Sequence, residues 1–294
     1  MGQGALILPE IIKRLRSIFF MPITWPYILS LIVIFIVLSV VFYTKIENYY
    51  VFFPQTGFEI TPDYLHLNYK DVYFDSLDGE KLHGWFFPTD ESQLVIMISH
   101  GNACNISHML DYANILTGMN LQVFLFDYRG YGKSTGAPSE KGIYMDAQAA
   151  YDYLVNEEKI VTDNIILFGQ SLGAAAAIDV AIKNHIRSII IEGAFTSTKD
   201  MAKTMFPMNI VSFLLPSNYN NLKKIAQINA PKLIVHGEDD EIVPFSMGKK
   251  LFEASMDPKF FYAIKGAGHN DTFIVGGKKY FEDLAYFVNH SKFP

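Results

Sequence analysis

The chain has very little cysteine and no excess of positive charge. Its 294 residues include a single cysteine, Cys104. One cysteine excludes an internal disulfide and a metal cluster held by several thiolates. The formal net charge is −6 and no run of Lys and Arg occurs, which argues against nucleic acid as a partner. Hydrophobic residues make up 50% of the chain, enough for one sizeable domain.

A long uncharged stretch near the N-terminus lies between Arg16 and Lys45. About 20 apolar residues cross a bilayer as a helix, and Trp25 and Tyr43 lie near the two ends, where membrane interfaces favour aromatic side chains. No small-x-small cleavage site follows, as a signal peptide would require. We therefore expect a transmembrane helix at residues 23–45, preceded by a cytoplasmic or interfacial segment at residues 1–22.

The charges beside that span predict its orientation. Lys13, Arg14 and Arg16 precede it, whereas Lys45 is followed closely by Glu47. Positive charge is retained on the cytoplasmic side of a membrane. The expected protein is single-pass, with its N-terminus in the cytoplasm and its large C-terminal part on the opposite side.

From residue 69 onwards, short apolar runs alternate with helical stretches. DVYFDS and KLHGWFFP flank a turn at Asp78-Gly79 and predict an antiparallel hairpin. Six further runs predict buried strands: LVIMIS, LQVFLFD, NIILFG, RSIIIEG, KLIVHG and KFFYAI. This alternation predicts an α/β domain at residues 69–294, with a mainly parallel sheet and helices on both faces. Residues 46–68 would be a linker.

Residues 195–228 interrupt the alternation. The segment is rich in methionine and phenylalanine and contains Pro207 and Pro216. We expect a short apolar cap segment here. Two interpretations stay open: a lid over a pocket, and ordinary helix packing, in which methionine commonly fills gaps.

The sequence GQSLG, residues 169–173, has the G-x-S-x-G pattern of a nucleophile elbow. It follows the predicted strand NIILF and opens an alanine-rich helix, which is the setting that the elbow requires. The glycines allow a sharp turn that exposes the Ser171 hydroxyl. The N-terminus of the following helix favours negative charge on the reacting oxygen. Ser171 is therefore the predicted nucleophile.

A serine nucleophile needs a base, and a carboxylate that orients the base. His269 lies in a glycine-rich loop after KFFYAI, and Asp240 lies in an acidic loop after KLIVHG. Both loops leave the carboxyl ends of predicted parallel strands, where open α/β sheets place their sites. The chain order Ser, Asp, His also matches the α/β-hydrolase triad. Asp239 is the alternative carboxylate, and His236 is expected to have a structural role.

An oxyanion hole requires two backbone N–H donors. Leu172, the residue after the nucleophile, is expected to supply one. The loop SHGNACN is expected to supply the other, from Asn102 or Ala103, because Gly101 lets the backbone approach a substrate. Cys104 lies in this loop, where we expect a small buried side chain rather than a nucleophile.

The stretch DYRGYGKSTG, residues 127–136, is similar to the end of a phosphate-binding loop. A Walker loop needs a glycine five residues before Gly132, and that position is Asp127. The residues up to Pro138 prolong the loop instead of starting a helix at the lysine. We therefore interpret the stretch as a tight loop whose geometry is fixed by Asp127 and Arg129.

Five motifs occur in order along the chain: HGNACN, DYRGYGKSTG, GQSLGA, HGEDDEIVP and GAGHND. Together they resemble the membrane-anchored α/β-hydrolase-fold serine hydrolases, which are related to the protein depalmitoylases and the serine aminopeptidase-like hydrolases. The resemblance covers the chain from about residue 69 to the C-terminus. It implies an α/β-hydrolase fold with Ser171 as nucleophile, Asp240 as acid and His269 as base. The family loop is usually HGNAGN, and Cys104 replaces its second glycine.

These observations predict a serine hydrolase that cleaves an acyl ester or thioester through an acyl-enzyme intermediate, with no metal and no cofactor. The expected substrate is a small-molecule or lipid-like acyl compound, because the chain is predicted to be membrane-anchored and has the apolar segment 195–228. Two alternatives stay open: a peptidase or amidase of the serine aminopeptidase-like type, and a catalytically silent anchored scaffold of the same fold.

Overall fold

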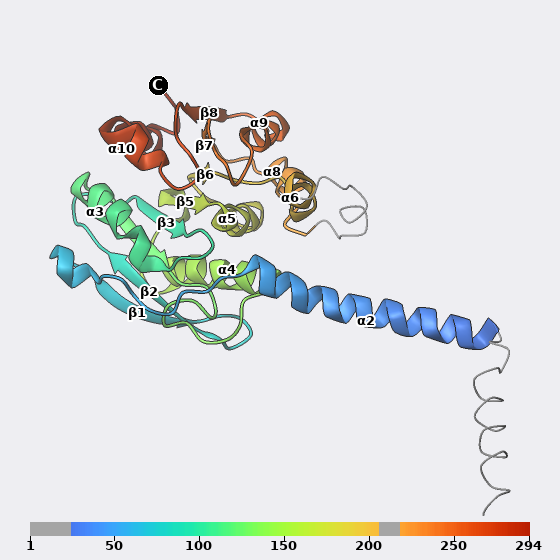
Figure 1. The fold of residues 1–294 in the computed structure, drawn as a ribbon. Helices are drawn as coiled ribbons and strands as arrows, with labels where there is room; N and C mark the ends of the chain where they lie inside the picture. The colour runs from blue at the N-terminus through green and yellow to red at the C-terminus, as the bar shows by residue number, and fades with distance from the viewer. Residues whose placement is uncertain (1–24, 206–217) are drawn as a thin grey trace, which may run out of the picture. The chain divides into compact units, whose positions relative to one another are not determined.

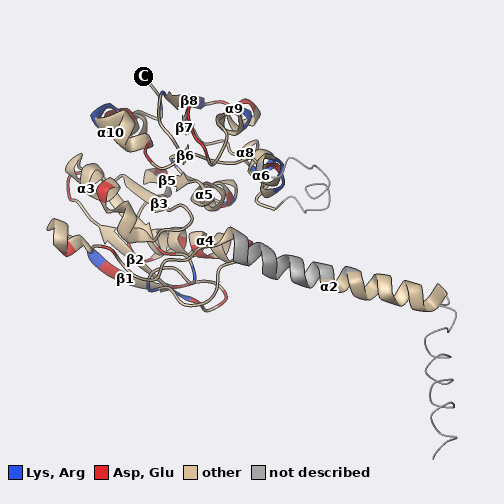
Figure 2. Cartoon of the chain, viewed as in Figure 1, with Lys and Arg blue, Asp and Glu red and all other residues tan. Residues whose placement is uncertain are grey.

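The computed structural model describes residues 25–205 and 218–294, and it divides into two units, Met1–Tyr50 and Val51–Pro294. Helix α2 spans Trp25–Val51, and its described side chains are all uncharged (Figures 1 and 2). Among the described residues, no helix combines the length and the apolarity that crossing a membrane requires. The span expected at residues 23–45 therefore stays a prediction, and the segment 1–22 lies outside the described residues.

The second unit is built around an eight-stranded sheet in the order β1-β2-β4-β3-β5-β6-β7-β8. The strands are β1 (Lys70–Asp75), β2 (Lys81–Phe87), β3 (Val95–Ser99), β4 (Gln122–Phe126), β5 (Ile165–Gln170), β6 (Ser188–Glu192), β7 (Lys232–Gly237) and β8 (Lys259–Ile264). Strand β2 runs antiparallel to both β1 and β4, whereas all other neighbours are parallel. The predicted α/β-hydrolase fold with an antiparallel N-terminal hairpin is confirmed.

Helices cover both faces of this sheet (Figure 1). One face carries α4 (Glu140–Asn156), α5 (Leu172–Lys183), α8 (Asn221–Ile225) and α9 (Phe245–Ala254), and the other carries α3 (Leu110–Gly118) and α10 (Thr272–His290). Short 3-10 helices occur at Pro62–Leu65, Ile106–Met109 and Thr162–Asn164. Helix α10 contains a kink at Gly277, whose φ of 56° and ψ of −145° are not helical.

The buried strands divide their side chains between two cores. In β3, Val95 and Met97 pack in the core beneath α4 and α5, whereas Ile96 and Ile98 pack in the core beneath α3 and α10. Successive side chains of a strand point to opposite faces. Because both faces are covered, these strands are apolar throughout rather than alternating.

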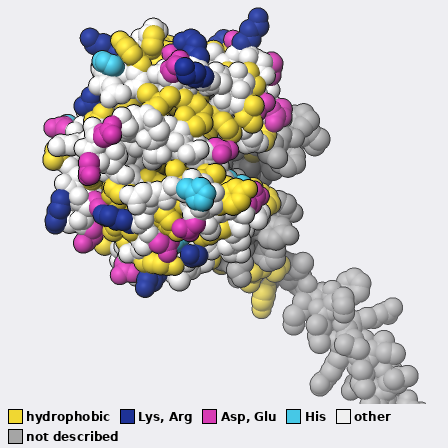
Figure 3. Space-filling view, turned by 90° about the vertical axis from the view of Figure 1, so that its left-hand side faces the viewer, with side chains coloured by type: hydrophobic (Ala, Val, Ile, Leu, Met, Phe, Trp, Pro, Cys, Tyr) yellow, Lys and Arg dark blue, Asp and Glu magenta, His cyan; other side chains and the backbone are white. Residues whose placement is uncertain are grey.

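The expected cap segment at residues 195–228 contains helix α6 (Thr198–Met205) as well as α8. Its residues 206–217 lie outside the described residues, so both interpretations of this segment stay open. Figure 3 shows acidic and basic side chains interspersed over one face of the molecule, around a band of hydrophobic ones.

Candidate active site

The backbone turns sharply at Ser171, between the end of β5 and the start of α5. Ser171 has φ 52° and ψ −112°, a combination that residues with a side chain rarely adopt. A Cβ atom at position 173 would lie 2.0 Å from the carbonyl oxygen of Ser99, and one at position 169 would lie 2.6 Å from Cα of Ala174. The turn therefore requires Gly169 and Gly173, and it leaves Ser171 lining a cavity.

Ser171, His269 and Asp240 form a continuous chain of hydrogen bonds. His269 Nε2 lies 3.0 Å from Ser171 Oγ, and His269 Nδ1 lies 2.8 Å from Asp240 Oδ2. The carboxylate and the imidazole follow the neighbouring parallel strands β7 and β8, whose carboxyl ends meet at one edge of the sheet. Asp239 is exposed, and its backbone N–H donates to the carbonyl of Ala267 at 3.0 Å. The structure thus brings Asp240, and not its neighbour, to His269.

The carboxylate of Asp240 is surrounded by donors. Its Oδ1 accepts the backbone N–H groups of Ile242 at 2.9 Å and Val243 at 2.7 Å. Burial would raise the pKa of Asp240, but hydrogen bonds with His236 and His269 and the charge of His269 hold that pKa well below its usual value. Asp240 is therefore negative at neutral pH and accepts a hydrogen bond from Nδ1 of His269.

His236 was expected only to have a structural role, yet its Nε2 lies 3.2 Å from Oδ2 of Asp240. The same nitrogen donates to the carbonyl of Val243 at 2.9 Å. The imidazole is fully buried and therefore shields the carboxylate from water. The sequence offers one signal for this contact, the spacing of four residues between His236 and Asp240.

The three predicted oxyanion donors, Leu172, Asn102 and Ala103, line the same cavity as Ser171. Leu172 is the first residue of α5, so no carbonyl within the helix accepts its N–H. Ala103 has φ 56°, a left-handed conformation that turns the loop. The side chain of Asn102 is bonded elsewhere, because its Oδ1 accepts the N–H of Phe53 at 3.1 Å.

Cys104 is half-buried and lines the cavity, so the expected buried position is wrong. The turn at Ala103 places the thiol at the cavity wall, with Sγ 3.1 Å from the carbonyl oxygen of Gly101 and 3.5 Å from Nδ1 of His100. Burial would lower the pKa of His100, but the charges of Cys104 and Asp127 and hydrogen bonds to both raise it to about 10.

The loop DYRGYGKSTG holds its charged groups in contacts with the rest of the domain. Arg129 binds Asp146 and Asp78 at 2.8 and 2.7 Å, and the fully buried Asp127 accepts the N–H of Ile106 at 3.0 Å. These contacts agree with a loop whose geometry is fixed by charged side chains rather than with a phosphate site.

The cavity at Ser171 has a volume of about 660 Å³. Its polar lining includes Gln170, Tyr112, His108 and Asn270. Its apolar lining consists of Val51, Met109, Leu172, Phe195, Met201, Ile242, Val243 and Phe273. The hydroxyl of Ser171 therefore faces a largely apolar space.

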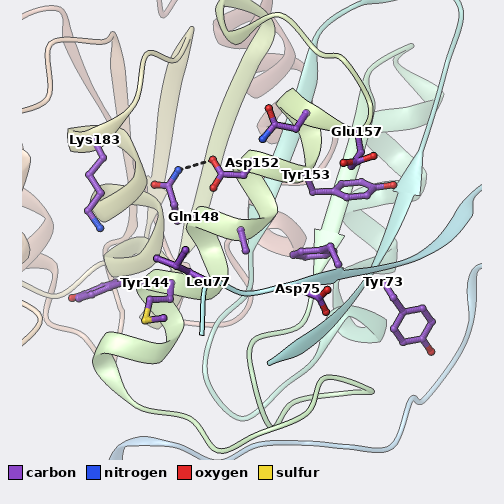
Figure 4. Close-up of a pocket in the computed structure, with 13 residues that line it drawn as sticks. Tyr73, Asp75, Leu77, Tyr144, Gln148, Asp152, Tyr153, Glu157 and Lys183 are labelled. Carbon is purple, nitrogen blue, oxygen red and sulfur yellow. Dashed lines mark hydrogen bonds between the residues drawn. The ribbon is translucent and has the colours of Figure 1, made fainter. Parts of the chain in front are cut away.

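A second cavity of about 570 Å³ is lined by residues of β1, α4 and the end of α5 (Figure 4). Tyr73, Tyr144 and Tyr153 contribute to its wall, and the side-chain amide of Gln148 donates to Asp152 there at 3.0 Å. The described residues that line it include no serine, cysteine or histidine. The cavity at Ser171 is therefore the candidate active site.

The strand order, the turn at Ser171 and the chain order Ser, Asp, His define an α/β hydrolase. A family model described as serine aminopeptidase, S33, matches residues 90–219. Protein bem46 of Schizosaccharomyces pombe is 34% identical over 287 residues, which cover 93% of this chain and 95% of bem46. The α/β hydrolase domain-containing protein WAV2 of Arabidopsis thaliana is 34% identical over 255 residues, which cover 79% of this chain and 82% of WAV2. The chain belongs to the same family of α/β hydrolases as these two relatives.

Solved structures agree on the fold. The esterase Pf2001 of Pyrococcus furiosus has a TM-score of 0.69 to this chain and 22% sequence identity, and the match covers 81% of this chain and 97% of the esterase. At this level of identity the likeness shows the fold alone.

Proposed function

We propose that this protein is a serine hydrolase that cleaves an acyl ester or thioester through an acyl-enzyme intermediate. The observation that carries the proposal is the hydrogen-bonded chain from Ser171 through His269 to Asp240, at the turn between β5 and α5. Membership in a family of hydrolases supports it.

The proposed reaction begins when Oγ of Ser171 attacks the acyl carbonyl carbon and His269 Nε2 takes the hydroxyl proton. Asp240 stabilises the imidazolium, and the N–H of Leu172 with that of Asn102 or Ala103 stabilises the oxyanion. The imidazolium then donates its proton to the departing alcohol or thiol. Water attacks the acyl-enzyme with His269 as base, which releases the acid and restores Ser171. No step requires a metal or a cofactor.

The lining of the cavity supports a hydrocarbon-like acyl group. Met109, Phe195, Met201 and Phe273 present apolar surface around the nucleophile, in a space of about 660 Å³. Burying apolar substrate surface there gains roughly 25 cal/mol per Å². We therefore propose a lipid-like or other apolar acyl substrate.

Covalent labelling tests the catalytic part of the proposal. A fluorophosphonate should add once to the wild-type protein and to Ser246→Ala, which alters an exposed serine of α9, but not to Ser171→Ala. Intact-mass spectrometry reads the result. Labelling that persists in Ser171→Ala, or that fails in the wild type, contradicts the proposal and favours a silent scaffold.

Chain length and leaving group test the substrate class. With p-nitrophenyl esters of rising acyl length, kcat/KM should increase beyond acetate, whereas a strict preference for acetate contradicts the apolar acyl group. The family description, serine aminopeptidase, favours amide cleavage as the second candidate function. Matched ester and p-nitroanilide substrates decide between them, since a hydrolase of esters should turn over the anilide far more slowly.

We also propose that residues 23–45 hold the protein at a membrane, with the N-terminus in the cytoplasm. The support is the uncharged sequence between Arg16 and Lys45 and the basic residues before it. The protein should pellet with membranes after an alkaline carbonate wash, and external protease should digest the hydrolase domain in intact cells. Recovery in the soluble fraction contradicts the anchor, and protection from the protease contradicts the orientation.

A further inference from the structure

The last residue of α2, Val51, begins a segment that is otherwise without regular secondary structure and that lies against the loop of the candidate oxyanion donors. We call residues 51–59 the strap and residues 100–105 the oxyanion loop. Val51, the first residue of the strap, lines the cavity together with Asn102 and Ser171. The strap is fixed to the domain by Phe52, which is buried and packs against Tyr219 with ring centroids 6.5 Å apart.

The side chain of Asn102 is bonded to the strap at both ends of its amide. Its Oδ1 accepts the backbone N–H of Phe53 at 3.1 Å and the hydroxyl of Tyr131 at 2.8 Å. Its Nδ2 donates to the carbonyl oxygen of Val51. These bonds leave little freedom for the side chain and so fix the backbone from which it extends.

A second set of bonds holds the far end of the oxyanion loop. Asn105 is fully buried, and its Nδ2 donates to the carbonyls of Gln55 at 3.1 Å and Gly57 at 2.7 Å. Just beyond the loop, Oγ of Ser107 accepts the N–H of Glu59 at 3.1 Å. The strap therefore forms hydrogen bonds with the oxyanion loop on both sides of Ala103.

The oxyanion loop has little support from its own backbone. From Gly101 to Cys104, within the described part of the chain, no backbone–backbone hydrogen bond holds the main chain in place. An oxyanion hole accelerates a reaction only if its donors are already oriented when charge develops on the substrate oxygen. Orientation of this loop must therefore come from side chains, and Asn102 makes three such bonds.

We propose that Asn102 is a positioning residue of the oxyanion hole, which orients the loop's N–H donor by binding the strap through its carboxamide. The proposal rests on the proposed serine hydrolase function, because it assigns a cause to the geometry of that site. In this proposal the strap contributes to the geometry of the active site, in addition to connecting α2 with the sheet.

Full-length variants with matched controls test the proposal. Asn102→Ala removes all three bonds, whereas Asn102→Asp keeps the acceptor for Phe53 and Tyr131 and loses the donor to Val51. Ser246→Ala is the control, because it changes an exposed serine of α9 that belongs neither to the strap nor to the cavity lining. We expect kcat per fluorophosphonate-titrated site to fall about tenfold or more in both variants, with KM near wild type, because Asn102→Asp places a carboxylate oxygen against the Val51 carbonyl and negative charge beside the oxyanion. Ser246→Ala should match the wild type.

Inhibition by a trifluoromethyl ketone separates positioning from general stability. The ketone forms an oxyanion on Ser171, so its affinity should fall in Asn102→Ala by the same factor as kcat. A kcat within twofold of wild type overturns the proposal, and so does a lower kcat with unchanged affinity for the ketone. Should Asn102→Ala not fold, Phe53→Pro removes one of the same bonds and Phe53→Ala keeps it, and equal activity in these two variants overturns the proposal.

Hydrogen exchange distinguishes failure of this proposal from failure of the proposed function. If the wild type does not react with fluorophosphonate, the hydrolase function fails, yet the strap is still tested. Amides of residues 101–104 should exchange faster in Asn102→Ala than in Ser246→Ala or wild type. Equal exchange in all three proteins overturns the positioning role whatever the activity.

Discussion

Ser171 and Asp240 are held by two different constraints. The serine is fixed by backbone geometry. Its positive φ requires Gly169 and Gly173, because these two glycines let neighbouring segments of the backbone approach closely. The carboxylate is fixed by hydrogen bonds, from Ile242, Val243 and the two histidines. The two residues should therefore respond differently to substitution.

Asp240→Asn should reduce kcat/KM by about 10³–10⁴, since the amide cannot stabilise the imidazolium or fix its tautomer. The pKa of Asp240 is lower in the folded protein than in the unfolded chain, where it is about 3.9. The ionised carboxylate therefore stabilises the folded wild type above about pH 3.9. This stabilisation is lost as the pH falls towards the folded pKa. The stability advantage of wild type over the variant should therefore be constant above about pH 5 and shrink below pH 4. Ester hydrolysis and urea unfolding measure the two effects.

Asp239→Asn is the matched control for that substitution. It changes an adjacent but exposed carboxylate, so its activity should stay within about twofold of wild type. A large loss in Asp239→Asn, or a small one in Asp240→Asn, would show that the roles of the two carboxylates are reversed.

Gly173→Ala should destabilise the domain by about 3 kcal/mol or prevent folding, because the new Cβ would lie 2.0 Å from the carbonyl oxygen of Ser99. Gly118→Ala is its counterpart at the end of α3, where no atom lies within 4 Å of the new Cβ. That change should leave stability equal or raise it by up to about 1 kcal/mol. Urea denaturation compares them, and similar values for both variants would contradict the close packing at Gly173.

At the scale of elements, Glu192 at the end of β6 joins the sheet to two helices and to the turn at Ser171. Its carboxylate accepts the hydroxyl of Tyr112 from α3 at 3.1 Å, the hydroxyl of Tyr280 from α10, and Nε2 of Gln170 at 3.0 Å. Its backbone carbonyl accepts the N–H of Ser171 at 2.8 Å. One buried carboxylate thus connects α3 and α10 to β5, the strand that ends directly before Ser171.

Glu192→Gln should change the pH dependence of stability. Burial raises the pKa of Glu192, so the folded state retains a proton that the unfolded chain releases near pH 4.3. Wild type should therefore lose stability relative to the variant as the pH rises from about 4.3 through the folded pKa. Urea unfolding between pH 4 and 8 measures this difference. A difference that stays constant with pH would show that the carboxyl is ionised without cost.

The sequence predicts those parts of the fold and site that depend on local pattern. Apolar runs indicate each strand because both faces of the sheet are buried, and the Gly-x-Ser-x-Gly spacing indicates the turn at Ser171 because its geometry is set within five residues. The kink of α10 at Gly277 is likewise local, because glycine readily adopts a positive φ.

Contacts between distant segments could not be predicted in this way. Asn102 binds backbone atoms about 50 residues away, in a strap with no periodicity to mark it. Glu192 meets Tyr112 and Tyr280, which lie 80 and 88 residues away. Such pairings follow from the order of strands in the sheet, which the sequence pattern leaves open.

At the scale of the whole molecule, the boundary between the two units lies between Tyr50 and Val51, where the strap begins. The first residues of the second unit contribute to the candidate site. Val51 lines its cavity, and residues 53–59 form hydrogen bonds with the oxyanion loop and with Ser107 just beyond it. Removal of residues before this boundary should thus differ in effect from removal of residues after it.

A chain that begins at residue 46 should keep kcat/KM for a short water-soluble ester within about twofold of the full-length protein, since every bond of the strap is retained. It should also no longer pellet with membranes. A chain that begins at residue 59 lacks the acceptors for Asn102 and Asn105, the buried Phe52 and the ring contact of Phe58 with Trp85. Its kcat per titrated site should therefore fall at least about tenfold. Counting only sites that react with fluorophosphonate removes the contribution of unfolded protein. Equal kcat in the two truncated chains would show that the oxyanion loop keeps its geometry without the strap.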